Sequence, residues 1–215
     1  MEILNISEHL GHFQLPEDVW KPLIPFLYEI REEDPESDVR SNFGGWQKNG
    51  IQDCDELFEF KQNLIDRIDQ YVHWLHEQYY VPVVERQDPK WAISIDNVFV
   101  NINPKGSYHV MHSHTGCNYS GVFYLQSDAG TSGGLHIQHP FKSPWMGEMQ
   151  GRTTKDLYTV IEPEPGTGII FPAYLLHHVG PNMAEDDRIA ISFNFTVHFN
   201  EHVSDLLQEL EKSRK

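Results

Sequence analysis

Residues 188–199, Arg-Ile-Ala-Ile-Ser-Phe-Asn-Phe-Thr-Val-His-Phe, alternate large apolar residues with small or polar ones. Residues two apart in a β-strand point to the same face, so this pattern predicts a long strand with one apolar face on a core. The opposite face carries Arg188, Ser192 and Asn194, and it lines either solvent or a polar cavity. In a cavity, Arg188 would bind an anion. The apolar face comprises Ile189, Ile191, Phe193, Phe195, Val197 and Phe199.

Several shorter runs before this segment have the same period of two. They are separated by glycine and proline turns, which is typical of short strands in an antiparallel sheet. These runs occur at 92–103, 121–126, 135–138, 158–162 and 168–171.

Helical patterns fill the first part of the chain. Apolar residues recur every three or four positions over 55–80, which predicts a long helix, with Asp53 and Glu56 as its capping box. The stretch 15–34 is predicted as short helical pieces interrupted by prolines, and 34–50 as an ordered surface loop that a tryptophan anchors on the core.

Helices followed by many short strands predict a mainly β protein, an antiparallel sandwich or jelly roll with a helical cover. The 215 residues, 39% of them hydrophobic, suit one domain. We divide it into an N-terminal helical cover at 1–90, a β core at 91–200 and a C-terminal tail at 201–215. The acidic runs 32–34 and 185–187 are predicted to be solvated loops.

The composition of the chain indicates where the protein is located and which binding partners its charge disfavours. Acidic residues outnumber basic ones by 32 to 16, for a formal net charge of −16, which argues against nucleic acid as a partner. The sequence has neither an apolar run of about 18 residues nor a signal-peptide pattern, so membrane insertion and export are not expected. Two cysteines without a CxxC motif favour a cytoplasmic location. An oligomer is possible, because aromatic residues of the N-terminal arm could serve a dimer contact.

Three histidines have the spacing of a metal site. His112 and His114 are two apart on an extended chain, so both imidazoles can reach one ion, and His177 follows another apolar strand. Three convergent ligands that leave coordination positions open are typical of a catalytic metal. Four other histidines, at 73, 76, 136 and 139, are predicted to be structural.

The order of these motifs resembles that of the 2-oxoglutarate and Fe(II)-dependent oxygenases. More narrowly, it is similar to the prolyl-hydroxylase-like branch found in bacteria and their phages. The resemblance covers about 41–194. Its motifs are Ser41-Asn42, Gly44-Gly45-Trp46-Gln47, His112-Ser113-His114, Ser120-Gly121-Val122-Phe123-Tyr124-Leu125, Gly133-Gly134-Leu135, Phe171-Pro172 through His177-His178-Val179, and Arg188 to Asn194.

The resemblance implies a double-stranded β-helix in which His112 and His177 bind Fe(II) and Arg188 holds the 5-carboxylate of 2-oxoglutarate, assisted by Ser192. A guanidinium suits a carboxylate because it can donate two parallel hydrogen bonds. Further candidates for co-substrate contacts are Tyr124, Asn103 and Tyr108. Candidates for a supporting shell around the site are His109, Asn194 and His178.

One position departs from the family pattern. The usual metal ligands are two histidines and a carboxylate, and here His114 stands at the carboxylate position. Either the site has three histidines, or a carboxylate such as Asp128 or Glu148 reaches in, or the position is open or water-filled.

The resemblance implies an oxidoreductase, a dioxygenase that uses 2-oxoglutarate and O2 to hydroxylate a substrate C–H bond, and it suggests a peptide or protein substrate. Two alternatives stay open at this point. One is a three-histidine zinc or cupin-like metalloenzyme. The other is a non-catalytic jelly-roll binding module.

Overall fold

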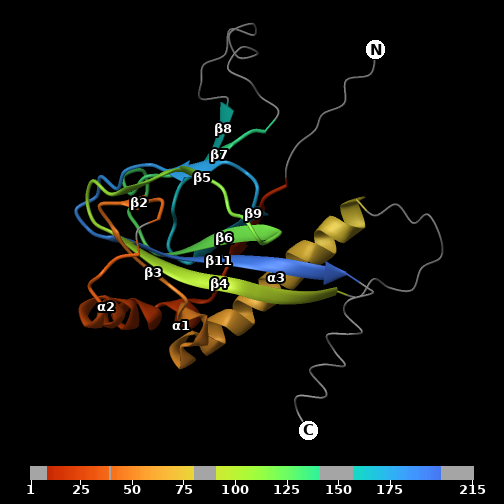
Figure 1. The fold of residues 1–215 in the computed structure, drawn as a ribbon, viewed down its shortest axis with the longest axis horizontal. Coiled ribbons are helices and arrows are strands. Elements are labelled where there is room, and N and C mark those ends of the chain that lie inside the picture. The colour runs from red at the N-terminus through yellow and green to blue at the C-terminus, as the bar shows by residue number, and fades with distance from the viewer. Residues whose placement is uncertain (1–8, 39, 80–90, 141–156, 200–215) are drawn as a thin grey trace, which may run out of the picture.

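The structure is a computed structural model that describes residues 9–38, 40–79, 91–140 and 157–199. It contains two facing antiparallel sheets (Figure 1). The larger sheet has the strand order β1 (Gly11–Gln14), β9 (Thr167–Pro172), β6 (Tyr119–Gln126), β11 (Arg188–Phe199), β4 (Trp91–Asn103) and β3 (Trp46–Asn49). The smaller sheet has the order β2 (Asn42–Phe43), β5 (Tyr108–His112), β10 (His177–Val179), β7 (Leu135–Gln138) and β8 (Tyr158–Ile161).

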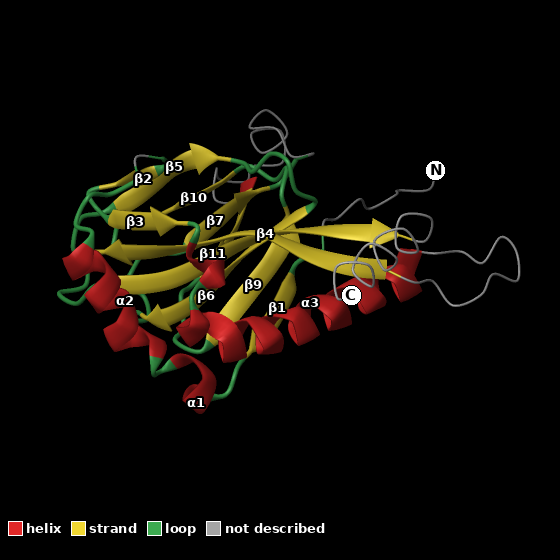
Figure 2. Cartoon of the chain, turned by 60° about the horizontal axis from the view of Figure 1, so that its bottom comes forward, coloured by secondary structure: helices red, strands yellow, loops and turns green. Residues whose placement is uncertain are grey.

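Three helices cover the outer face of the larger sheet, so its inner face is left to the smaller sheet (Figure 2). They are α1 (Glu17–Trp20), α2 (Leu23–Glu33) and α3 (Phe58–Tyr79), with two 3-10 turns, η1 (Ile51–Asp53) and η2 (Asp55–Leu57), before α3. No helix in the described part of the chain is long and apolar enough to span a membrane.

The predicted core face of β11 is confirmed. Ile191, Phe193 and Phe195 are fully buried, and they belong to one cluster with the apolar stripe of α3. Phe60 of α3 meets Phe123 of β6 edge to face, with ring centroids 5.3 Å apart. Burial of such side chains stabilises a fold by about 1.5–3 kcal/mol each, so the contact between β11 and α3 is a major source of stability.

Two helix starts differ from the predictions. Pro25 lies in the first turn of α2 and does not interrupt it, because the N–H that a proline lacks has no partner in a first turn anyway. The capping box of Asp53 and Glu56 is wrong: α3 begins only at Phe58, and the turn before it starts after Cys54 without a side-chain cap.

The stretch 34–50 is only partly a loop, because it contains β2 and β3. Trp46 anchors it as predicted: the side chain is buried, and its Nε1 donates to the carbonyl of Asp34 at 3.0 Å. The short strands β1, β2, β3 and β10 were not predicted, because a period of two does not stand out in them, whereas β7 and β8, with four residues each, were predicted.

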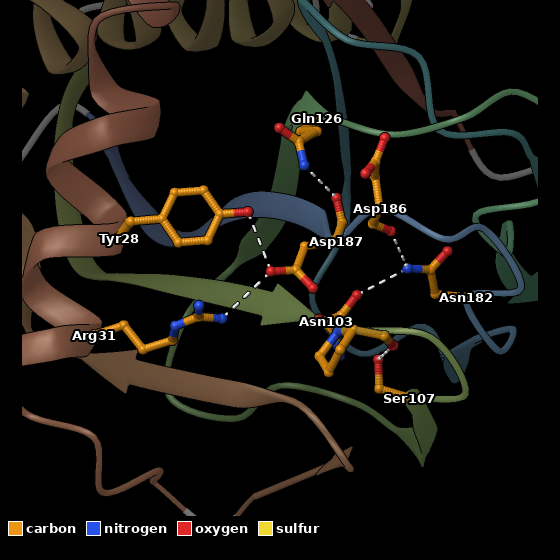
Figure 3. Close-up of polar contacts among 9 residues, drawn as sticks. Tyr28, Arg31, Asn103, Ser107, Gln126, Asn182, Asp186 and Asp187 are labelled. Carbon is orange, nitrogen blue, oxygen red and sulfur yellow. Dashed lines mark hydrogen bonds and ion pairs between the residues drawn. The ribbon is translucent and has the colours of Figure 1, made fainter.

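The start of β11 is held by a polar cluster (Figure 3). Asp187 accepts hydrogen bonds from the Tyr28 hydroxyl at 3.1 Å and from Arg31 Nη1 at 3.3 Å, and its backbone carbonyl accepts one from Gln126 Nε2 at 2.8 Å. Burial first, and the Asp187 charge second, raise the pKa of Tyr28, which keeps its hydroxyl a donor. The prediction that this acidic run is only a solvated loop is therefore wrong for Asp187, which ties α2 to β11.

Asn182 lies within the same cluster and is fully buried. Its Nδ2 donates to the carbonyls of Asn103 and Asp186, both at 2.9 Å, and its Oδ1 accepts from the Ala184 amide at 3.1 Å. A carboxylate could not donate to the two carbonyls. We therefore expect Asn182→Asp to lower the free energy of unfolding by about 3 kcal/mol, measured by urea denaturation.

The matched control is Asn63→Asp on α3, where the side-chain Nδ2 bonds to the Glu59 carbonyl at the surface. Its effect should stay within about 0.5 kcal/mol. Equal losses in the two variants would show that the buried bonds of Asn182 do not matter.

Candidate metal and co-substrate site

A cavity of about 670 Å³ lies between the two sheets. One wall is the inner face of β3, β4, β6 and β11, and the other is formed by β5, β7 and β10. The polar face of β11 that the sequence predicted lines this cavity. Its lining contains two arginines, Arg40 and Arg188, but no carboxylate from any described residue, although the chain as a whole carries a net charge of −16.

Three histidines converge in the cavity. His112 at the end of β5 is the cross-strand neighbour of His177 in β10, and His114 follows two residues after His112. One ring nitrogen from each can be chosen so that all three lie within 4.8 Å of one another. The structure thus brings together the three residues that the sequence singled out.

The hydrogen bonds of these histidines fix their orientation. Nδ1 of His112 contacts the Val110 carbonyl, and Nδ1 of His177 contacts the Leu175 carbonyl, each at 2.8 Å. A carbonyl only accepts, so both Nδ1 atoms carry the proton and both Nε2 atoms present a lone pair. His112 Nε2 lies 3.4 Å from the Ser41 hydroxyl oxygen. The ring of His114 stacks on Phe99, with centroids 6.2 Å apart.

Burial keeps the three imidazoles neutral. It lowers the pKa of His177 to about 3 and that of His114 to about 4, and it also lowers the pKa of His112. Neutral imidazole is the form that binds a metal ion. The donor set and its burial therefore fit a divalent transition metal.

Among the described residues, no carboxylate joins the cluster. Asp128 lies in a turn with Ser132 and does not line the cavity, so it does not complete the site. Glu148 lies outside the described residues.

Arg188 occupies the other end of the cavity, where it is 2% exposed. Its Nη1 donates to the carbonyls of Ser132, Gly133 and Gly180, while its Nη2 is buried and has no partner among the described residues. Tyr124 also lines the cavity, and its buried hydroxyl has no partner within the part of the chain that the structure describes. Burial raises the pKa of Tyr124 to about 12, so this hydroxyl keeps its proton and can donate.

Gly133 allows the backbone to surround Arg188 Nη1 with the carbonyls of Ser132, Gly133 and Gly180, an arrangement that we call the clamp. Its φ is +73°, and a Cβ there would lie 2.3 Å from the Gly180 carbonyl oxygen, which is itself an acceptor for Arg188. We expect Gly133→Ala to destabilise the fold by about 3 kcal/mol in urea denaturation, because strain and a backbone clash add.

Gly130→Ala is the matched control for the strain alone. Gly130 has a φ of +77° but nothing within 4 Å of its Cβ position, so a loss of about 1 kcal/mol is expected. If Gly133→Ala costs no more than Gly130→Ala, the close approach to Gly180 is not needed.

Two other predicted residues lie between Arg188 and the histidines. His109 is buried, with Nε2 3.4 Å from Asn103 Oδ1 and Nδ1 3.5 Å from Ser41 Oγ. Both His109 and Asn103 line the cavity. His109 and His112 face inward although they are three apart, because β5 has a bulge opposite β10.

Ser192 and Asn194 line the cavity, but neither bonds to Arg188. Ser192 Oγ accepts from Asn101 Nδ2 at 3.4 Å, and Asn194 Oδ1 accepts from Ser120 Oγ at 2.8 Å. Four residues of strand place Ser192 roughly 13 Å along β11 from Arg188. The expectation that Ser192 assists Arg188 directly is therefore not met in this structure.

Tyr108 and His178 lie outside the cavity. Tyr108 is 40% exposed and stacks on Phe43, because the strand turns its neighbour His109 inward instead. His178 stacks on His136, with centroids 4.5 Å apart, on the outer face of the smaller sheet. Neither Tyr108, for which a co-substrate contact was predicted, nor His136 lines the cavity.

Comparison with known proteins agrees with this geometry. Residues 97–194 match the model of a family described as "Putative 2OG-Fe(II) oxygenase", a span that contains the three histidines and Arg188. No curated protein sequence matches the chain.

Solved structures with the same fold include a prolyl-4-hydroxylase from Pseudomonas putida, at 16% identity over 88% of this chain and 93% of that one, with a TM-score of 0.59. They also include a 2OG-Fe(II) oxygenase family oxidoreductase from Burkholderia pseudomallei, at 16% identity over 86% and 84%, with a TM-score of 0.51. A third is SnoK, a non-heme alpha-ketoglutarate-dependent carbocyclase from nogalamycin biosynthesis, at 10% identity over 92% and 86%, with a TM-score of 0.60.

Residues 97–194 thus match the 2OG-Fe(II) oxygenase family, and the chain has the jelly-roll fold of these enzymes. It is a dioxygenase whose cofactor is Fe(II) and whose co-substrates are 2-oxoglutarate and O2. The resemblance found in the sequence, with its prolyl-hydroxylase-like fold, is confirmed.

Proposed function

We propose that His112, His114 and His177 are the Fe(II) ligands of this oxygenase, and that Arg188 and Tyr124 bind the distal carboxylate of 2-oxoglutarate. One observation carries the proposal: the cavity that holds three neutral imidazoles also holds two buried polar groups that no described residue pairs. A buried unpaired polar group costs about 1–3 kcal/mol, so a ligand that accepts from both is strongly favoured.

When bound, Fe(II) and 2-oxoglutarate supply the oxidative decarboxylation that oxidises a substrate C–H bond with O2. The protein's part is positioning. The Val110 and Leu175 carbonyls hold His112 and His177 with Nε2 toward the cavity. Arg188 presents one nitrogen, Nη2, and the protonated Tyr124 hydroxyl presents a second donor to the same carboxylate.

Apolar side chains line the space between these groups and limit the access of water. Leu135 and Phe171 are buried, and Val122 and Val179 pack against them. Excluding water strengthens the electrostatic interactions of Arg188 with an anion. Asn103 and His109 complete the polar lining at this end and support the bound co-substrate.

An all-histidine ligand set leaves the iron site one charge unit more positive than two histidines and a carboxylate would. The same three neutral ligands also suit zinc, so a zinc or cupin-like metalloenzyme is the second candidate. The observation that favours it is the lack of a carboxylate among the described lining residues.

One titration tests the proposal and separates these candidates. Fe(II) and then 2-oxoglutarate are added without oxygen to metal-free protein, and the visible charge-transfer band of 2-oxoglutarate chelated to ferrous iron is followed. A band that requires both additions supports the oxygenase site. Bound metal without a band, together with zinc in protein purified without added metal, would favour the second candidate.

Further parts of the proposal rest on the sequence. We propose a peptide or protein substrate from the resemblance, and a cytoplasmic location from the cysteine usage, with Cys54 and Cys117 both free. We also propose one domain, with cover, core and tail at 1–90, 91–200 and 201–215.

A further inference from the structure

The cavity opens to solvent beside the proposed metal ligands. Ser113, which stands between His112 and His114 in the chain, is exposed and lines the cavity, whereas Arg188 is 2% exposed and lies at the closed end. A substrate must therefore enter on the side of the histidines, because 2-oxoglutarate occupies the end at Arg188. The exposed members of the described lining mark this mouth, and they are Arg40, Val110, Ser113 and Thr115.

Arg40 carries the only charge among these four residues. Its guanidinium has no ion pair or hydrogen bond with any residue that the structure describes. Asp38, two residues earlier, does not line the cavity, and its Oδ2 accepts from the backbone amide and from Nδ2 of Asn49, both at 2.8 Å. The bonds from Asn49 are the main cause that lowers the pKa of Asp38, and the charge of Arg40 contributes least. The donors of Arg40 are thus available to a ligand.

Hydrogen bonds on both sides of Arg40 hold its backbone between the two sheets. The Asp38 amide donates to the Gln47 carbonyl of β3 at 2.9 Å, and the Ser41 carbonyl accepts from the Val110 amide of β5 at 3.0 Å. Strand β3 belongs to the larger sheet and β5 to the smaller one. Arg40 is therefore anchored at the side of the cavity and does not belong to a loose surface loop.

This anchoring places Arg40 near the proposed metal position. The hydroxyl oxygen of the next residue, Ser41, lies 3.4 Å from Nε2 of His112. Neighbouring Cα atoms are about 3.8 Å apart, so an anion bound by Arg40 lies on the order of 10 Å from that nitrogen. One amino-acid residue or one small acid can span this distance.

The charges of the cavity favour an anionic substrate. Burial lowers the pKa of all four histidines in the lining and keeps them neutral, so its charge comes from Arg40 and Arg188. Because no described carboxylate joins the histidines, the two negative charges of 2-oxoglutarate balance only those of Fe(II), and the two arginines leave a positive excess. In a chain of net charge −16, such a cavity concentrates anions at its mouth.

We propose that Arg40 binds a carboxylate of the primary substrate, which belongs either to a free acid or chain terminus or to an acidic side chain. A planar guanidinium can donate two parallel hydrogen bonds to a carboxylate. A doubly charged phosphate would need a second cation, and the described residues of the mouth do not offer one. The proposal rests on the proposed function, because it places 2-oxoglutarate at Arg188.

The test uses the full chain loaded with one equivalent each of Zn(II) and 2-oxoglutarate, which fill the metal and Arg188 sites without turnover. Ligand-observed NMR titration measures the affinities of four small probes. N-acetylglycine carries a terminal carboxylate, and the α-amide of N-acetylaspartate carries a side-chain carboxylate. N-acetylglycinamide is the neutral counterpart, and N-acetylaminomethylphosphonate carries a phosphonate.

Three variants are compared with the wild type, and urea denaturation shows that each is folded. Arg40→Gln removes the charge, and Arg40→Lys keeps the charge without the planar fork. Arg67→Gln is the matched control, because it changes the net charge equally but lies on α3, outside the cavity, where Arg67 bonds to Gln70.

We expect a carboxylate probe to bind the wild type about tenfold more tightly than N-acetylglycinamide and more tightly than the phosphonate. Arg40→Gln should remove about tenfold, since one charge-assisted contact is lost, and Arg40→Lys should fall between the two. Arg67→Gln should bind as the wild type does, and the tighter carboxylate probe identifies the source of the carboxylate. Equal binding of acid and amide, tighter binding of the phosphonate, no measurable binding, or unchanged affinity in Arg40→Gln would overturn the proposal.

Two further measurements separate this proposal from the proposed function. In metal-free Arg188→Leu without 2-oxoglutarate, adding Arg40→Gln should again remove about tenfold of the carboxylate affinity. The charge-transfer titration gives the 2-oxoglutarate affinity, which Arg40→Gln should leave within about threefold of the wild type. Intact 2-oxoglutarate binding in Arg188→Leu would overturn the proposed function but not the carboxylate site. A loss of 2-oxoglutarate binding in Arg40→Gln as large as in Arg188→Leu would overturn the carboxylate site.

Discussion

Replacing Arg188 with leucine is expected to weaken 2-oxoglutarate binding by about 100-fold. The variant loses the charged donor Nη2, and a hydrogen bond between charged groups contributes about 1.5–3 kcal/mol, which approaches two powers of ten in affinity. The charge-transfer titration with Fe(II) measures the dissociation constant. Iron content should stay at the wild-type level, because the three histidines lie on other elements.

The leucine variant also removes the donor to three backbone carbonyls, so its stability must be measured beside its affinity. Arg188→Lys is the matched variant: it keeps the positive charge but lacks the planar fork. We expect it to bind 2-oxoglutarate more tightly than the leucine variant and less tightly than the wild type. Wild-type affinity in a folded leucine variant would remove Arg188 from the site.

Replacing His177 with alanine is expected to lower the affinity for Fe(II) by at least about 100-fold, because one of the three proposed metal ligands is lost and the remaining two cannot compensate. Anaerobic equilibrium dialysis followed by metal analysis gives this value directly. The charge-transfer band should vanish with the metal.

His136→Ala is the matched control, because this histidine lies in the adjacent strand but on the outer face of the sheet. It should retain metal and band. His114→Ala then decides the number of histidine ligands: a comparable loss of iron supports an all-histidine set, whereas full retention assigns the metal to His112 and His177 alone. Undiminished iron in His177→Ala would contradict the proposed centre.

Elements whose hydrophobic pattern extends over many residues could be predicted from the sequence. The twelve residues of β11 and the apolar stripe of α3 extend over several periods, so both elements were predicted correctly. The shortest strands could not be predicted, since β2 has two residues and β10 three. Their formation depends on partners far away in the sequence.

The candidate site was predictable where spacing carries the information. Histidines two apart, and an arginine at the start of an alternating strand, need no knowledge of distant contacts. The inward turn of His109 and the outward turn of Tyr108 could not be foreseen, because a bulge in β5 breaks the alternation. Nor did composition reveal the role of Asn182 or of Asp187, whose partners lie in other elements.

The clamp on Arg188 has a consequence for which oxoacids the enzyme accepts. Because three carbonyls fix Nη1 and the Gly133 turn fixes those carbonyls, the guanidinium cannot follow a shorter ligand toward the histidines. The fixed distance from Arg188 to the proposed metal ligands thus selects oxoacids by the length of their carbon chain. A four-carbon homologue anchored at Arg188 would end one bond, about 1.5 Å, short of the position that the five-carbon acid reaches.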